Sequence, residues 1–160
     1  MACNRPCPFS SGSEFTDRAN VRRYRKGVYM PEGTLLIAPC GMNCGVCLAY
    51  LREKRKCPGC HGEDDHKSAS CIRCIIKNRE TIKLSQSKFC FDCKKYPCLR
   101  LKQLDKRYRT KYKMSMIKNL ESIKEIGLSA FIKKENKRWH CLKCGGVICV
   151  HRGYCLHCGS

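Results

Sequence analysis

Residues 40–98 open with CGMNCGVC at 40–47 and continue through CPGC at 57–60, CIRC at 71–74 and FCFDCKKYPC at 89–98. Two cysteines separated by two residues can bind one metal through a short turn whose backbone N–H groups point at the sulfurs. Side-chain packing alone does not require so many closely spaced cysteines, so the sequence predicts a core held by metal–thiolate bonds. The predicted ligands are Cys40, Cys44, Cys47, Cys57, Cys60, Cys71, Cys74, Cys90, Cys93 and Cys98.

The composition agrees with a fold stapled by metal. The 160 residues include 17 cysteines but only 8% aromatic residues, so we expect metal sites to replace much of a large apolar core. No stretch approaches the roughly 18–20 apolar residues that span a bilayer, and the sequence shows no secretory leader. We therefore expect a cytoplasmic protein, because a reducing compartment favours metal–thiolate bonds over disulfides. The odd cysteine count also leaves at least one thiol outside any complete disulfide pairing.

The core cysteines admit more than one pairing and more than one metal. CPGC and CIRC make a natural set of four ligands, and the triplet at 40–47 then needs a fourth thiolate, with Cys98 preferred and Cys90 or Cys93 as alternatives. A C-x3-C-x2-C triplet is unusual for zinc, so we favour iron–sulfur clusters of the [4Fe–4S] type in this core. Zinc satisfies the same spacings and is the alternative.

A second cysteine group lies in WHCLKCGGVICVHRGYCLHCGS at 139–160. Each of its two C-x-x-C pairs is followed by glycine, and the apolar residues Val147, Ile148 and Val150 lie between the pairs. Two such pairs on a small hairpin hold one tetrahedral ion, so we predict a zinc ribbon. Its predicted ligands are Cys141, Cys144, Cys155 and Cys158. Cys149 lies on the hairpin and is predicted to be a packed thiol.

The segment after the core cysteines predicts helices. A helix at 98–108 follows from a proline at its start and from apolar residues at helical spacing. A second helix at 116–126 has Ser115 as its N-cap and Gly127 as its stop. Shorter helical turns are expected near Val46 and after CIRC.

The predicted fold class is a small, irregular α+β protein. It combines a metal-stapled domain with short helices, a helical segment and a C-terminal zinc-ribbon hairpin, and Leu35-Leu36-Ile37 adds a short strand. The predicted organisation is a basic N-terminal extension at 1–39, a metal-cluster domain at 40–100, a basic helical segment at 101–138 and the zinc ribbon at 139–160.

The chain is strongly basic, with a formal net charge of +20. It stays basic after subtraction of about two charges for each four-thiolate site. A basic protein meets nucleic acid, anionic lipid or an acidic protein face, and charge alone does not choose among them. The predicted partner-binding residues are Arg22, Arg23, Arg25, Lys26, Lys102, Lys106, Arg107, Arg109, Lys111 and Lys113. The second group, with Tyr108 and Tyr112 interleaved, suits phosphate contacts.

Other chemistry finds little support in the sequence. Cys3 and Cys7 are too isolated to define a site, and His61 and His66 are expected to be solvated loop residues. The triplet at 40–47 is similar to the cluster motif of radical SAM enzymes, but those need a large α/β barrel. No Gly-rich phosphate loop, nucleophile elbow or acid–base pair stands out, so we do not expect an enzyme.

The ordered cysteine motifs resemble a known family. CGMNCGVCLAYLREKRKCPGC, followed by CIRC, FCFDC, YPC, RYRTKYKMSMIKNLESIKEIG and HCLKCGGVICVHRGYCLHCG, is similar to a cysteine-rich family of anaerobic archaea and bacteria catalogued as a domain of unknown function. The resemblance covers about residues 38–159. It implies metal binding and leaves the N-terminal extension outside.

These patterns lead to one preferred function and two alternatives. The first is a non-enzymatic iron–sulfur protein that responds to redox state or oxygen and docks through its basic surface on the acidic face of a larger protein complex, such as an oxygen-sensitive enzyme. The second is a zinc-stapled protein that binds RNA or the ribosome. The third is a small electron carrier, which requires a cluster near the surface.

Overall fold

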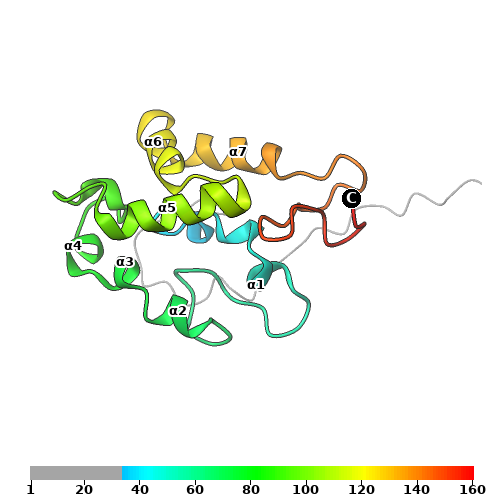
Figure 1. The fold of residues 1–160 in the computed structure, drawn as a ribbon, viewed down its shortest axis with the longest axis horizontal. Coiled ribbons are helices and arrows are strands. Elements are labelled where there is room, and N and C mark those ends of the chain that lie inside the picture. The colour runs from blue at the N-terminus through cyan, green and yellow to red at the C-terminus, as the bar shows by residue number, and fades with distance from the viewer. Residues whose placement is uncertain (1–33) are drawn as a thin grey trace, which may run out of the picture.

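The computed structural model describes residues 34–160, which are drawn in colour in Figure 1. Most of the predicted N-terminal extension lies outside the described residues. The same holds for Cys3, Cys7, Arg22, Arg23, Arg25 and Lys26. Within residues 34–160 the chain is mostly helical and rich in cysteine.

The helical elements fall into a short and a long group. Three are 3-10 helices: η1 (Thr34–Leu36), η2 (Cys44–Val46) and η3 (Cys90–Asp92). The α-helices are α1 (Leu48–Leu51), α2 (Ala69–Ile72), α3 (Ile75–Asn78), α4 (Glu80–Lys83), α5 (Leu99–Tyr112), α6 (Met116–Ile126) and α7 (Leu128–Arg138). η1 precedes the core cysteine motifs, the other short elements lie among them, and the three long helices follow.

Strand structure in residues 34–160 is limited to isolated antiparallel bridges. They pair Ile37 with Asn43, His140 with Val147, and Ile148 with Cys155. The predicted strand at 35–37 is wrong, because the chain turns through η1 and brings Leu36 against the CPGC turn. Only two of these bridges, His140 with Val147 and Ile148 with Cys155, lie in the predicted ribbon hairpin. Residues 34–160 therefore do not contain the sheet that the predicted α+β class requires.

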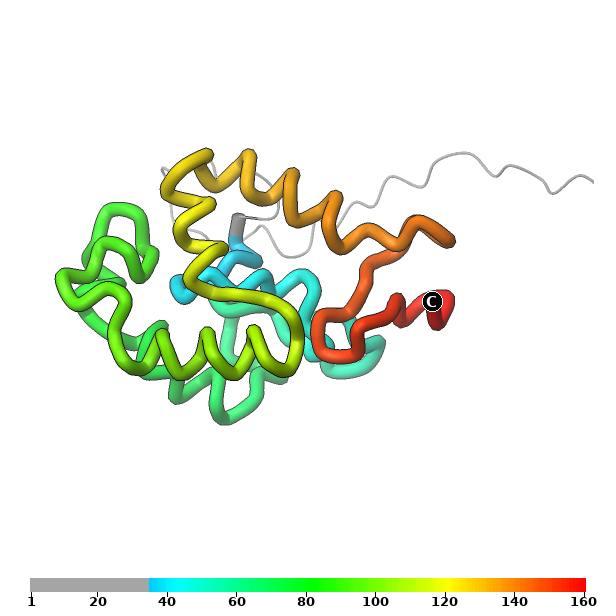
Figure 2. Tube along the Cα trace, turned by 45° about the horizontal axis from the view of Figure 1, so that its top comes forward, coloured from blue at the N-terminus to red at the C-terminus, as the bar shows by residue number. Residues whose placement is uncertain are grey.

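The three long helices cover the cysteine-rich region. α5 packs against α6, and α6 packs against α7. Figure 1 shows these helices on one side of the molecule and α1–α4 on the other. In Figure 2 the first part of the cysteine region, in cyan, runs between α5 and α7, and the C-terminal segment lies at one end of the molecule.

Local sequence sets the ends of α5 and α6. The helix predicted at 98–108 continues to Tyr112 and ends at Lys113, which adopts the left-handed conformation. Ser115 then caps α6, because its hydroxyl accepts a hydrogen bond from the N–H of Lys118. Gly127, with φ of 81°, ends α6 and allows α7 to start at once in a new direction. The predicted bounds and caps of the 116–126 helix are confirmed.

The buried side chains form one connected apolar core that the cysteine count did not predict. Leu101 of α5, Leu120 of α6 and Phe131 of α7 meet there, and Cys40 and Cys90 belong to the same cluster. The core cysteines therefore adjoin an apolar core instead of replacing it.

Close contact with α6 fixes the loop of the first triplet. A Cβ atom on Gly41 would lie 2.7 Å from the carbonyl oxygen of Met116 and 2.9 Å from the side chain of Leu120. The φ of Gly41 is also positive, at 84°, so this position requires glycine. The Asn119 side chain donates to the Gly41 carbonyl at 2.8 Å, which holds the loop on α6.

A buried carboxylate joins α5 to α6. One oxygen of Asp105 accepts hydrogen bonds from the Ser115 hydroxyl at 2.6 Å and the Ile117 N–H at 3.2 Å, and the other accepts from Arg109 Nε at 2.7 Å. Burial disfavours the charged form, but these three donors outweigh it and lower the pKa of Asp105. Asp105 therefore stays ionised and anchors the corner between the helices.

We expect Asp105→Asn to lower the free energy of unfolding by about 2 kcal/mol at pH 7, because an amide cannot accept from all three donors. Since the folded pKa lies below the unfolded value, the carboxylate's contribution is complete above about pH 4 and is lost as the pH falls further. Urea denaturation from pH 7 to 3 should show the deficit shrinking below pH 4. The exposed Asp65→Asn is the control, and a deficit equal to that of the control at pH 7 would contradict this role.

Candidate metal centre

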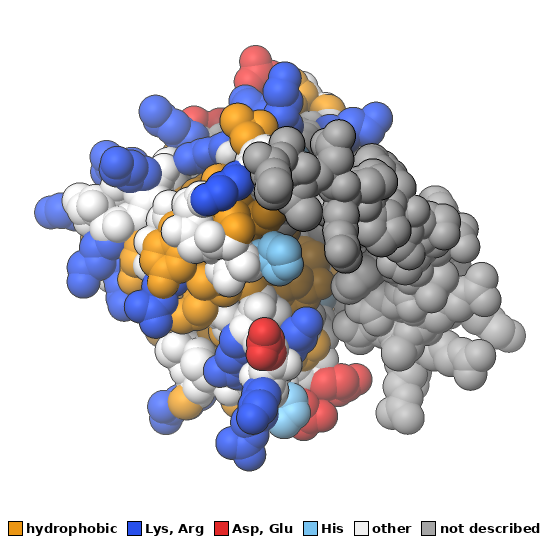
Figure 3. All heavy atoms as spheres, turned by 90° about the vertical axis from the view of Figure 1, so that its right-hand side faces the viewer, with side chains coloured by type: hydrophobic (Ala, Val, Ile, Leu, Met, Phe, Trp, Pro, Cys, Tyr) orange, Lys and Arg blue, Asp and Glu red, His pale blue; other side chains and the backbone are white. Residues whose placement is uncertain are grey.

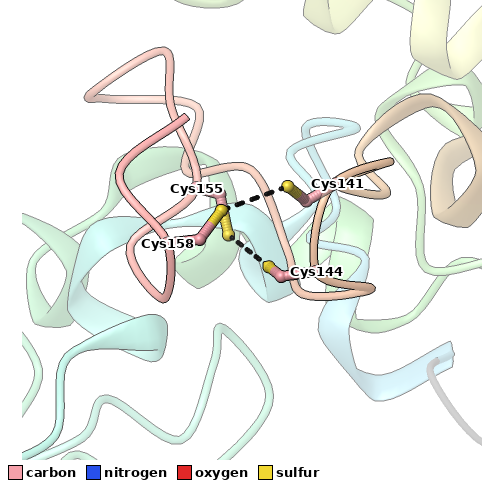
Figure 4. A group of neighbouring side chains, drawn as sticks. All are labelled: Cys141, Cys144, Cys155 and Cys158. Carbon is pink, nitrogen blue, oxygen red and sulfur yellow. Dashed lines mark hydrogen bonds between the residues drawn. The ribbon is translucent and has the colours of Figure 1, made fainter. Parts of the chain in front are cut away.

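Four cysteine sulfurs converge in the C-terminal segment (Figure 4). The Sγ atoms of Cys141, Cys144, Cys155 and Cys158 all lie within 4.8 Å of one another. Two of the separations are 3.5 Å, from Cys141 to Cys158, and 3.6 Å, from Cys144 to Cys155. A tetrahedral zinc ion with Zn–S bonds of about 2.3 Å places its sulfurs about 3.8 Å apart. The four residues predicted from the sequence therefore fit a single metal ion.

Two matching turns build this site. In each C-x-x-C-G turn the glycine N–H donates to the carbonyl of the first cysteine, Gly145 to Cys141 at 2.8 Å and Gly159 to Cys155 at 2.9 Å. Both glycines have positive φ, 76° and 73°. A Cβ on Gly146 would lie 3.2 Å from Cys155 Sγ and 3.3 Å from Cys144 Sγ, so a larger side chain there would crowd the sulfurs. The glycines that follow the cysteines thus shape the site.

The thiols of this site differ in pKa. Hydrogen bonds from the backbone and hydroxyl of Ser160, and then from Cys144, lower the pKa of Cys158 to about 6. The Gly146 N–H favours the thiolate of Cys144, but hydrogen bonds to Cys158 and Cys155 prevail and raise the pKa of Cys144 to about 12. The pKa of Cys155 is also lowered, by backbone hydrogen bonds from Cys158 and His157, so Cys155 and Cys158 favour the thiolate while Cys144 favours the thiol. A metal cation removes this conflict because it stabilises all four thiolates.

The cysteines of the 40–98 core do not converge as the four C-terminal cysteines do, and they differ in burial. Cys40 and Cys90 are buried in the apolar core, Cys57 is half-buried and Cys71 is exposed. The other core cysteines pack against the apolar core: Cys44, Cys47, Cys60, Cys74, Cys93 and Cys98. Among residues 34–160 the C-terminal four are the group whose sulfurs all come within 4.8 Å. The core ligands predicted from the sequence thus lie in one region but are not gathered at the spacing of a single ion.

The C-terminal site is fastened to the first triplet. The Val150 N–H donates to the Val46 carbonyl at 2.9 Å. Nδ1 of His151 accepts from the Leu48 N–H at 3.3 Å, which leaves the proton on Nε2, and Nε2 lies 3.2 Å from the Tyr108 hydroxyl. Sequence patterns did not assign a role to His151, because its partners are remote in the chain.

Several single-residue expectations can now be placed. Cys149 is fully buried, as expected of a packed thiol. His66 is exposed as expected, but His61 is half-buried instead of solvated because its Nε2 lies 3.0 Å from the Ile37 carbonyl oxygen; neither belongs to the four-sulfur group. The predicted basic residues of α5 and its end are exposed: Lys102, Lys106, Arg107, Arg109, Lys111 and Lys113. Tyr108 and Tyr112 instead pack their rings against His151.

Comparison with known proteins gives no relative from which a function could be transferred. No protein-family model, curated protein or solved structure matches the sequence. No helix among residues 34–160 has both the length and the apolar character needed to cross a membrane. The interpretation of the site therefore depends on its own geometry.

We expect Cys144→Ser to remove one metal equivalent, because a hydroxyl is a poor replacement for a thiolate in a four-sulfur site. Elemental analysis of the purified variant measures this loss. Cys149→Ala is the matched control, since it removes a cysteine from the same segment but not from the four. Equal metal content in both variants would contradict the ligand assignment.

We expect His151→Phe to lower the free energy of unfolding by about 1–2 kcal/mol, because the Leu48 N–H loses its acceptor. Burial, and then the charge of Arg107, lower the pKa of His151. The neutral ring's contribution is therefore complete above about pH 6.5 and is lost as the pH falls through the folded value. Denaturation between pH 7.5 and 5 should show a shallower pH dependence in His151→Phe than in wild type. The exposed His157→Phe should retain the wild-type slope; a wild-type slope in His151→Phe would refute the role.

Proposed function

We propose that this protein is a non-enzymatic metalloprotein with zinc in its C-terminal site and [4Fe–4S] clusters in the 40–98 core. It responds to redox state or oxygen and docks through a basic surface on the acidic face of a larger protein complex. The observation that carries the proposal is the convergence of four sulfurs within 4.8 Å in the C-terminal segment. That convergence supports metal binding by the closely spaced cysteine pairs of this chain.

The surroundings of the core cysteines favour a cluster there. An iron–sulfur cluster contains several atoms and so holds its thiolates farther apart than one zinc ion does, which suits cysteines that pack around one apolar core without converging within 4.8 Å. Burial of Cys40 and Cys90 in the apolar core limits access of solvent and oxidant. Oxidative loss of a cluster would release these cysteines and loosen the packing around them, which supplies the proposed response.

The docking surface is a cationic row on α5. Lys102, Lys106 and Arg109 recur every three or four residues, which places them along one face of the helix, and Lys113 follows at its C-cap; all four are exposed. Asp105 already pairs with Arg109, so the lysines supply most of the available charge. Such a row attracts an anionic partner over several ångströms and sets its orientation.

An acidic protein face fits this row better than RNA does. Single-stranded RNA is bound by phosphate contacts together with aromatic rings on which bases stack. The two tyrosines interleaved among the basic residues of this helix, Tyr108 and Tyr112, pack their rings against His151. RNA binding through phosphate contacts alone is the alternative function.

A small electron carrier is a further candidate, supported by one observation. Electron transfer requires a cluster close to the surface. Cys71 is exposed and Cys57 is half-buried, so a cluster held by either residue would lie near solvent. Reversible reduction without any change in partner affinity would favour this function.

The metal proposal is tested by iron, zinc and acid-labile sulfide analysis of protein purified without oxygen, together with a visible absorption spectrum. We expect iron and sulfide in similar amounts, one zinc and a broad visible band, because cysteine-ligated clusters absorb visible light and zinc does not. Exposure to air should bleach the band. Colourless protein with zinc alone would contradict the cluster and support the zinc-stapled alternative.

The docking proposal is tested with polyglutamate as a model acidic partner. We expect Lys102→Glu/Lys106→Glu/Lys113→Glu to weaken binding at low salt by at least tenfold, because three attractive charges become repulsive. The control is Lys124→Glu/Lys133→Glu/Lys134→Glu, which makes the same charge change at exposed positions of α6 and α7. Equal weakening by both variants would contradict a specific row, and stronger, salt-sensitive binding of polyuridylate would favour the RNA alternative.

A further inference from the structure

We infer that Cys44, Cys47, Cys57 and Cys60 bind one metal centre together, separate from a second centre that includes Cys90, Cys93 and Cys98. The inference rests on the proposed function only in that the core binds metal. It replaces the pairing predicted from the sequence, in which CPGC joined CIRC and the first triplet recruited Cys98. The arrangement of the backbone around the two C-x-x-C pairs carries it.

The first pair is preformed as a ligand turn. Cys44 opens η2, the Asn43 side chain accepts from the Gly45 N–H at 2.9 Å, and the Cys47 N–H donates to the Cys44 carbonyl at 3.0 Å. The backbone N–H groups of Ala49 and Tyr50 favour the thiolate form of Cys47, against the effect of burial. This is the pattern of a metal-binding turn, with N–H groups directed at sulfur.

The CPGC turn packs directly on the first pair. The Cys57 N–H donates to the carbonyl of Ala49 at 2.8 Å. Ala49 is two residues after Cys47, so this hydrogen bond brings the CPGC turn close to the first pair. Gly59 is buried with φ of 87°, and a Cβ there would lie 3.1 Å from Leu36 and 3.7 Å from the Cβ of Cys44. The two turns are therefore in contact through Cys44 and Gly59.

The sulfurs of the two pairs influence one another in a consistent way. Burial raises the pKa of Cys44, and the adjacent thiol of Cys60 raises it further while the Cys60 N–H opposes this. Burial also raises the pKa of Cys47, and Cys57 and then Cys71 add to the effect. The thiols of Cys44 and Cys60, and those of Cys47 and Cys57, are thus close enough to influence one another, which agrees with the backbone contacts between the two turns.

A buried cation accompanies these four cysteines. The side chain of Lys67 is 1% exposed, and its ammonium donates to the carbonyl of Cys60 at 3.2 Å, the carbonyl of Gly62 at 2.6 Å and Asp64 at 3.1 Å. A four-thiolate centre carries about −2 overall for zinc or an oxidised four-iron cluster. Lys67 already pairs with Asp64, and its ammonium beside Cys60 would also compensate part of the charge of a four-thiolate centre.

The cysteines proposed for the second centre lie around a small cavity. Cys90, Cys93 and Cys98 line one small cavity together with Arg79 and Tyr96. The Cys90 N–H donates to the Pro39 carbonyl at 2.9 Å, which places this group beside Cys40. Arg79 supplies the cation there, as Lys67 does for the first centre. Each group thus has its own positive charge.

Cys74 is the main competitor for the first centre. Burial, and then the thiol of Cys74, raise the pKa of Cys60 to about 11, so Cys74 also lies near the CPGC turn. It belongs to the CIRC pair, whose other member, Cys71, is exposed. The experiment must therefore separate Cys44 from Cys74 as the partner of Cys57.

Metal content of single and double serine variants makes this separation. If Cys44 and Cys57 share a centre, Cys44→Ser/Cys57→Ser loses no more metal than either single variant, whereas Cys57→Ser/Cys93→Ser loses the sum of its two single variants. Additive loss in the Cys44/Cys57 pair, with non-additive loss in Cys57→Ser/Cys74→Ser, would overturn the inference and restore the pairing of CPGC with CIRC.

A second measurement on the wild-type chain guards against variants that do not fold. Metal-stripped protein is titrated anaerobically with zinc, alkylated with iodoacetamide, and mapped by mass spectrometry. We expect Cys44, Cys47, Cys57 and Cys60 to become protected together, at a different zinc equivalent from Cys90, Cys93 and Cys98. Joint protection of Cys57 with Cys71 and Cys74, without Cys44, would refute the ligand set. A different result would overturn the proposed function: the core cysteines stay unprotected in the wild-type protein, and metal binds only at the C-terminal site.

Discussion

Repulsion among closely spaced thiolates is the constraint on which the described structure depends. Four sulfurs within 4.8 Å of one another cannot all lose their protons unless a cation lies among them. Without metal, the conflict appears as a pKa lowered to about 6 at Cys158 and raised to about 12 at Cys144. With metal, the same crowding becomes four bonds, and the binding free energy stabilises the fold.

The C-terminal site also determines how the rest of the chain is held. It contacts the first triplet through Val150 and His151, and His151 extends the connection to Tyr108 of α5. On the other side, Glu135 of α7 is buried and accepts hydrogen bonds from Trp139 at 2.8 Å and Asn43 at 3.4 Å. The C-terminal site therefore connects the helices with the core cysteines.

Figure 3 views the molecule from the right-hand side of Figure 1, and basic side chains surround an apolar area on the visible described face.

The sequence predicted the parts that short-range chemistry controls. The C-x-x-C-G repeats identified the four C-terminal cysteines whose sulfurs converge, and Ser115 with Gly127 gave both ends of α6. It failed where the outcome depends on remote contacts: Leu36 turns toward Gly59 and no strand forms, and His151 finds partners on α5 and beside Cys47. Grouping of the core cysteines belongs to the same class, since spacing along the chain does not say which turns meet.

Hydrogen exchange of metal-loaded and metal-stripped protein, compared by mass spectrometry under reducing conditions, tests most directly whether metal–thiolate bonds hold this fold. The account predicts that stripping abolishes amide protection across residues 139–160 and 40–98 and weakens it in α5–α7, which lose the contacts of His151 and the core. Unchanged protection in the 40–60 and 139–160 segments after complete metal removal would contradict it.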